Sequence, residues 1–245
     1  MKERNKKLLN EITVIAVASL FLGFILALNL KWPILSIEPT LFLIMSGLAL
    51  LVVLVFVGAQ KLAAHALECE TKINLLGFKR FWFKEKHKLP FEFPSWFVFP
   101  LLVFFATLGN LKWLAILDVD ISPKSTKVRK KIFFLEESDV TKITSAGILA
   151  VIFLGIISKM IGLATGISNF TSFAVICMLF AFLSLIPIGM GFKLLVSSRF
   201  FWLFLIVFSF ILLAMMAVES LFAIIAAALI FATMAVIGYY MLENK

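Results

Sequence analysis

One uninterrupted apolar run limits what this chain can fold into more than any other feature. Residues 40–70 read TLFLIMSGLALLVVLVFVGAQKLAAHALECE, and residues 41–60 carry no formal charge over twenty positions. At about 1.5 Å per residue, about twenty apolar helical residues cross a hydrocarbon core of roughly 30 Å. We therefore expect a membrane-spanning helix that has Lys61, His65 and Glu68 near one of its ends.

The composition of the whole chain indicates a polytopic membrane protein. Hydrophobic residues make up 62% and charged residues 15% of the 245 positions, which is far from the composition of a typical soluble domain. A net charge of +9 could suggest nucleic acid, but apolar helices leave no sizeable soluble surface for it. The charge is better explained by membrane orientation, because Lys and Arg gather in cytoplasmic loops. We expect the lipid bilayer as a partner and no nucleic acid.

Hydropathy predicts further spans on both sides of this central helix. They are expected at residues 12–30, 143–163, 170–195, 200–218 and 221–241. The first span follows a basic segment, which favours a cytoplasmic N-terminus. With six spans in total the C-terminus is cytoplasmic too. We expect a single multi-pass domain over residues 1–245 in the cell membrane.

A seventh apolar stretch, residues 96–117, lies between two basic loops. The loops at 72–95 and 118–142 each contain six Lys or Arg, which is typical of the cytoplasmic face. The stretch between them is broken by Pro100 and by GNLK at 109–112. We interpret it as a re-entrant or broken hairpin, which a membrane tolerates only where other helices shield its backbone. The expected fold class is therefore all-α, with about six transmembrane helices and one such hairpin.

Three landmarks follow one another in an order that resembles a known family. They are the span that ends near His65, the basic segment with the broken stretch, and a later span that carries SLIPIGMGFKLL at 184–195. This order resembles the site-2 protease family, the intramembrane zinc metalloproteases, over residues 51–202. The resemblance implies a His-Glu-x-x-His helix that binds zinc through its two His and activates water through its Glu. It also implies an Asp ligand from a later span.

The residues at those family positions have changed. The matching run in the central span is KLAAH, in which Lys61 replaces the first His, Leu62 replaces Glu, and His65 remains. Residues 145–151 keep only the Ala-Gly pair of the family's Ala-Gly-Pro-x-x-Asn pattern. Met190 stands in place of the Asp ligand, and a thioether is a poor ligand for zinc. The resemblance therefore implies the scaffold without a complete catalytic set, and no residue is assigned as catalytic.

A different metal site involves His65 with two residues that follow it. His65, Glu68 and Cys69 stand at i, i+3 and i+4, which would place three groups that can ligate a transition metal on one helical face. The simpler interpretation is that His65 and Glu68 form an interfacial pair and that Cys69 is a small buried hydrophobe. We expect no cofactor under this simpler interpretation, and zinc under the other.

Three functions follow from these interpretations. A degenerate site-2-protease-like protein would bind or scaffold a membrane-protein partner without cutting it, and this is the function we expect. The alternative enzyme would be a zinc-dependent intramembrane endopeptidase with an aberrant ligand set. The third class is a small transporter or channel, although the sequence lacks the buried paired charges of a transport pathway.

Overall fold

The computed structural model describes residues 2–31, 34–36, 38–80, 88–123, 137–218 and 220–243. Over these residues the chain is mostly helical, and five helices are long and apolar enough to cross a membrane. The candidate spans are Leu9–Ala27, Pro39–Ala66, Glu137–Thr165, Ser168–Leu185 and Phe222–Tyr240. By the length and composition of its helices, the chain is a multi-pass membrane protein.

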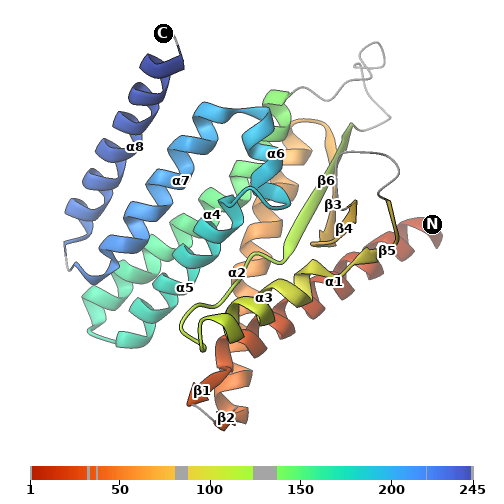
Figure 1. Ribbon diagram of the computed structural model, residues 1–245, viewed down its shortest axis with the longest axis horizontal. Coiled ribbons are helices and arrows are strands. Elements are labelled where there is room, and N and C mark those ends of the chain that lie inside the picture. Colours follow the sequence, from red (N-terminus) through yellow and green to blue (C-terminus); the bar gives the residue numbers. More distant parts are fainter. Residues whose placement is uncertain are drawn as a thin grey trace. The chain divides into compact units, whose positions relative to one another are not determined.

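Helices and short strands follow one another along the described chain (Figure 1). In order, the elements are α1 (Lys2–Ala27), β1 (Asn29–Lys31), β2 (Ile34–Ser36), α2 (Pro39–Ala66), β3 (Cys69–Leu75), β4 (Phe78–Arg80), β5 (Lys88–Phe93), α3 (Ser95–Ala106), β6 (Leu117–Pro123), α4 (Glu137–Thr165), α5 (Ser168–Leu185), α6 (Met190–Ser197), α7 (Arg199–Ala214), the 3-10 turn η3 (Met215–Ala217) and α8 (Leu221–Glu243).

The strands correct the expectation of an all-α chain. They form three two-stranded sheets, β1-β2, β3-β6 and β4-β5. β3 has the sequence CETKINL, in which Cys69 and Ile73 are buried while Glu70 is exposed. Short strands of this kind satisfy backbone groups in the connections between helices, and hydropathy does not distinguish such strands from loops.

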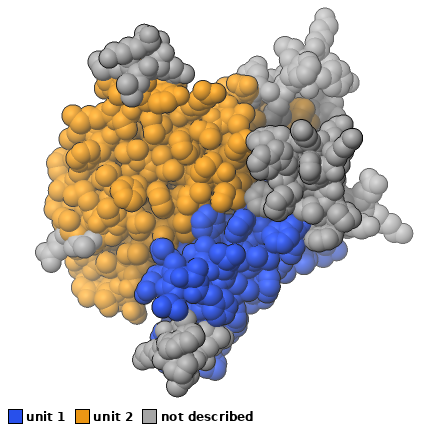
Figure 2. All heavy atoms as spheres, in the orientation of Figure 1, with its two compact units in different colours: residues 1–54, 72–120 blue, residues 55–71, 121–245 orange. Residues whose placement is uncertain are grey.

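The chain divides into two compact units (Figure 2). Unit 1 comprises residues 1–54 and 72–120, and unit 2 comprises residues 55–71 and 121–245. The division falls within α2, so that the end of α2 belongs to unit 2. We predicted a single domain and did not anticipate this division.

In unit 1, α1 and α3 pack through an apolar and aromatic cluster. Ile25 and Leu28, at the end of α1 and just after it, are buried together with Phe104 of α3. The ring of Phe21 meets the edge of Trp96, with 5.3 Å between the ring centroids. These contacts hold the short helix α3 against the N-terminal span.

The broken stretch at residues 96–117 consists of a short helix, a turn and an extended segment. α3 has twelve residues and is about 18 Å long, which is less than the thickness of a hydrocarbon core. It stops at a turn in which the Thr107 hydroxyl accepts a hydrogen bond from the Leu111 amide at 3.0 Å. Residues 111–116 then run without helix into β6. The stretch is therefore not one continuous helix.

In unit 2, the end of α2 and the helices from α4 onward form a bundle. α4 contacts α5 and α6, α5 contacts α7, and α7 contacts α8. Phe56 of α2 meets Phe180 of α5 edge to face, with ring centroids 5.3 Å apart. Large apolar side chains on the inward faces of these helices form the core of the unit.

The span predicted at residues 170–195 is two helices in the structure. α5 ends at Leu185 and α6 begins at Met190. Pro187 explains the break, because proline has no N–H and disfavours helical backbone at the residue before it. Gly189 then takes a left-handed φ of 65°, which glycine adopts without strain.

The helix expected at residues 200–218 is shorter than predicted. α7 contains 16 residues before it tightens into η3. At this end the buried Lys159 of α4 donates a hydrogen bond from Nζ to the Met216 carbonyl at 2.7 Å. A cation at a helix C-terminus pairs an otherwise unsatisfied carbonyl and interacts favourably with the helix dipole.

Candidate functional site

The end of α2 carries one fully buried polar side chain, Gln60. Along this helix Phe56, Val57, Gln60 and Ala64 are buried at spacings of three or four residues, which places them on one helical face. Gln60 has 0% of its surface exposed. Burying a carboxamide costs free energy unless the group is hydrogen-bonded. The surroundings of Gln60 are therefore the candidate site.

Two other helices of unit 2 contact the Gln60 carboxamide. From α6, the Met190 sulfur accepts a hydrogen bond from Gln60 Nε2 at 3.2 Å. From α4, Gly147 leaves the space that the Gln60 side chain fills, because a Cβ atom at Gly147 would lie 2.7 Å from Cγ and 2.9 Å from Nε2 of Gln60. Glycine at this position is what allows α4 to approach so closely.

Two buried polar atoms in this region have no hydrogen-bond partner within the described part of the chain. They are Oε1 of Gln60 and Oγ1 of Thr144. Thr144 lies one turn before Gly147 on α4, and Gly147 is the residue against which Gln60 packs. The carboxamide and the hydroxyl can donate and accept hydrogen bonds, but neither gains nor loses a proton near neutral pH.

The residues that the sequence resemblance placed at the catalytic positions lie off this buried face. Leu62 is 75% exposed, His65 is exposed, and Lys61 is half-buried. Met190, in contrast, is buried and in contact with Gln60. The structure therefore brings Met190 together with Gln60, a residue to which the resemblance gave no role.

The second predicted constellation, His65 with Glu68 and Cys69, assumed a helix that continues through residue 70. α2 ends at Ala66, Glu68 has a left-handed φ of 57°, and Cys69 begins β3. The three residues consequently do not share a helical face. Cys69 is buried with Ala64, whereas His65 is exposed. Among the described residues, no three His, Cys, Asp or Glu side chains come close enough to hold a metal ion.

Gln60 is the site residue that our sequence reasoning missed. We treated it as the last residue of an uncharged run and gave it no role. Its signal is periodicity, since continuing the buried positions 53, 56 and 57 by three or four residues reaches Gln60 and then Ala64. A polar residue on the apolar face of a span indicates a site more strongly than a charged residue near the end of that span.

No protein-family model matches this chain, and neither a curated protein nor a solved structure is significantly similar to it.

Proposed function

We propose that this protein is a membrane-embedded scaffold that holds a segment of another membrane protein without hydrolysing it. The contact between the Gln60 carboxamide and the Met190 thioether in the core of unit 2 carries this proposal. A hydrolytic centre needs a nucleophile or activated water together with a general base. These two side chains supply neither of them.

The proposal includes the sequence resemblance to site-2 proteases, with an alignment shifted by one residue. Gln60 and Ala64 are buried at i and i+4, the spacing of two zinc-binding His on one helical face. Met190 lies opposite Gln60, as an Asp ligand from a later span would. With this alignment Gln, Ala and Met occupy the three ligand positions, and Lys61 takes the place of the Glu general base.

We place the partner segment at the sheet that follows α2. β3 starts three residues after α2 ends and pairs only with β6 in the described part of the chain. The edge of a two-stranded sheet can bind an extended peptide through main-chain hydrogen bonds. Asn74 of β3 donates from Nδ2 to Asp120 Oδ2 of β6 at 2.6 Å, which links the two strands. An unwound segment of a membrane protein would add to residues 72–75.

The first experiment measures hydrolysis and metal content on the same preparation. The purified protein is reconstituted in proteoliposomes with single-span candidate substrates, and its zinc content is measured by elemental mass spectrometry beside a His65→Ala variant. We expect no specific cleavage and no stoichiometric zinc in either protein. Cleavage that a chelator abolishes, together with about one zinc per chain that is lost in His65→Ala, would establish the endopeptidase instead.

The second experiment tests the location of the partner. A photo-crosslinking amino acid is introduced at Lys72 in β3 and, as a control, at Ile230 on the exposed surface of α8. A single-span protein that the scaffold retains should crosslink at position 72 and not at position 230. Equal crosslinking at both positions would show that the retained protein does not use the sheet.

The third experiment tests the shifted alignment by rebuilding a ligand set. Gln60→His, Ala64→His and Met190→Asp, introduced together, should give a protein that binds about one zinc per chain. The reason is that Gln60 contacts Met190 and that Ala64 is buried one turn further along α2. The control combines Lys61→His with Met190→Asp and keeps the native His65. We expect no zinc in the control, because positions 61 and 65 lie off the buried face. The opposite result would refute the alignment.

A further inference from the structure

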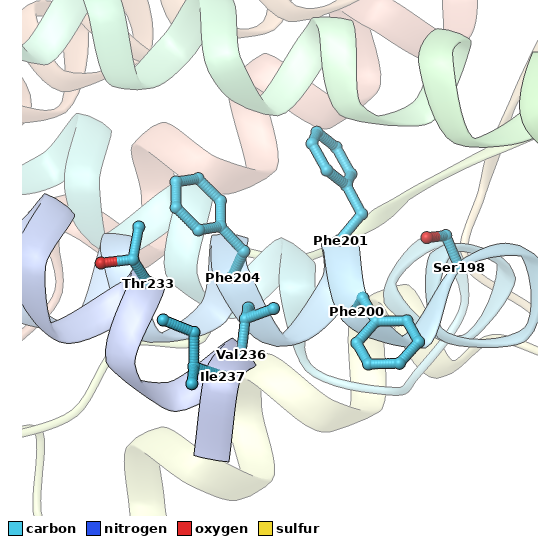
Figure 3. A pocket seen from close by; sticks show the side chains of 7 residues that line it. All are labelled: Ser198, Phe200, Phe201, Phe204, Thr233, Val236 and Ile237. Carbon is cyan, nitrogen blue, oxygen red and sulfur yellow. The ribbon is translucent and has the colours of Figure 1, made fainter. Parts of the chain in front are cut away.

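A groove between α7 and α8 forms an open cavity within unit 2. Its volume is about 450 Å³, which falls within the roughly 300–1,000 Å³ of small-molecule sites. The walls are apolar and aromatic, formed by Phe200, Phe201 and Phe204 of α7 and by Thr233, Val236 and Ile237 of α8 (Figure 3).

The surface around this groove is exposed on a helix that is long and apolar enough to cross a membrane. α8 is a candidate membrane span, and only 17% of its most apolar window is buried within the protein. Among the residues that line the groove, Thr233 brings the only hydroxyl of the α8 wall, and it already donates to the Leu229 carbonyl of its own helix at 2.9 Å. The deep part of the groove therefore offers dispersion contacts rather than hydrogen bonds, which suits an acyl chain.

One end of the groove has the residues that mark a membrane interface. The ring of Phe200 meets Tyr239 and Tyr240, with ring centroids 5.3 Å and 6.2 Å apart, and Arg199 at the start of α7 is exposed. Tyr and Arg gather at the level of the lipid headgroups. Phe204 lies five residues beyond Arg199, about 7.5 Å deeper along the helix axis. The groove thus runs from the headgroup level into the hydrocarbon.

Arg199 supplies a positive charge next to the cavity, because it stands in the chain between the lining residues Ser198 and Phe200. The Arg199 guanidinium can bind phosphate oxygens through two parallel hydrogen bonds. Ser198, which lines this end of the cavity, precedes the first turn of α7 without capping it through its side chain. The first amides of α7 have no acceptor within their own helix, so they add donors for the same anion.

We propose that the α7–α8 groove binds one anionic phospholipid. Its phosphate lies at Arg199, and one acyl chain lies between the three Phe of α7 and the apolar residues of α8. The site would retain an anionic lipid at a fixed place on the protein, in addition to the general attraction between basic loops and the membrane surface.

The test is native mass spectrometry of the full chain released from nanodiscs of equal parts phosphatidylglycerol and phosphatidylcholine. We expect one retained lipid, with phosphatidylglycerol favoured about fivefold, the factor that corresponds to about 1 kcal/mol for one basic residue at a membrane surface. Arg199→Gln should abolish the preference, and Arg199→Lys should keep it. Lys142→Gln, which removes another exposed cation from unit 2, should leave the preference unchanged.

A second pair of variants tests the apolar part of the groove. Ile237 and Ile230 are both 55% exposed on α8, but only Ile237 lines the cavity. Ile237→Trp should fill the groove and reduce retention of both lipids, whereas Ile230→Trp should not. Equal retention in the two variants would overturn the proposal, as would a preference that survives Arg199→Gln. A second copy of the chain retained in place of lipid would also overturn it.

Discussion

Replacing Gly147 by alanine should destabilise unit 2 through its effect on Gln60. The added Cβ would lie 2.7 Å, 2.9 Å and 3.0 Å from Cγ, Nε2 and Cδ of Gln60, whereas non-bonded carbon atoms prefer about 3.5–4.0 Å. Three close contacts on one side chain force either α2 away from α4 or the carboxamide away from Met190. Overpacking of this kind costs about 1–3 kcal/mol. The expected fall in the melting temperature is about 2–4 °C for each kcal/mol.

Thermal unfolding in one detergent, followed by circular dichroism, measures this change. Gly58→Ala is the matched control, because Gly58 is on α2 within unit 2 and a Cβ atom at that position would meet nothing within 4 Å. Alanine should be neutral or stabilising there, since it is a better helix former than glycine. Gly147→Ala should cost less in a Gln60→Ala background, because the clashing side chain is gone. An unchanged melting temperature for Gly147→Ala alone would refute the contact.

Two lysines give further predictions. Lys159→Met should lower the melting temperature, because it leaves the Met216 carbonyl without the Nζ donor. An unsatisfied buried acceptor costs about 1–3 kcal/mol. Lys159→Gln keeps a donor and should lower the melting temperature less. Burial lowers the pKa of Lys112 below its ordinary 10.5, so the folded chain binds this proton less tightly than the unfolded chain does. The free energy of unfolding should therefore rise with pH as 10.5 is approached, and Lys112→Met should remove that part of the slope in melting temperature against pH.

Much of the fold could be predicted because a membrane imposes a length and an apolar composition on its helices. The spans predicted at residues 12–30 and 143–163 correspond to the candidate spans Leu9–Ala27 of α1 and Glu137–Thr165 of α4, although α1 itself begins at Lys2. The break inside residues 170–195 was missed because hydropathy averages over Pro187 and Gly189, whose effect is on backbone conformation. β3 was missed because Cys69 and Glu70 were interpreted as the end of the preceding helix, and residues 72–75 as part of a basic loop.

The candidate site was predicted less well, for a reason that lies in the geometry of one helix. Each residue turns an α-helix by about 100°, so an alignment that is shifted by one position points to a different face. Aligning KLAAH with the His-Glu-x-x-His motif placed the site at Lys61 and His65. The residues that are buried at this end of α2 are Gln60 and Ala64. Met190, which the resemblance placed at the position of the Asp ligand, is in contact with Gln60.

The remaining prediction asks whether the buried carboxamide stabilises the bundle at all. Gln60 Oε1 is buried and has no partner in the described residues, and an unsatisfied acceptor costs about 1–3 kcal/mol. Its Nε2 bond to the Met190 sulfur is the weak kind that a thioether accepts. Gln60→Met keeps nearly the same volume and removes the unsatisfied oxygen, so it should raise the melting temperature by a few degrees.

Gln60→Ala serves as the control for packing at this position. It leaves a cavity and should lower stability by about 2–5 kcal/mol. If Gln60→Met lowers the melting temperature as much as Gln60→Ala does, the carboxamide makes a bond worth more than its burial costs, and the polar group is itself a structural element. If Gln60→Met raises it, the polar group costs stability where it stands. Retaining it would then require a role in binding, which the crosslinking and zinc measurements can identify.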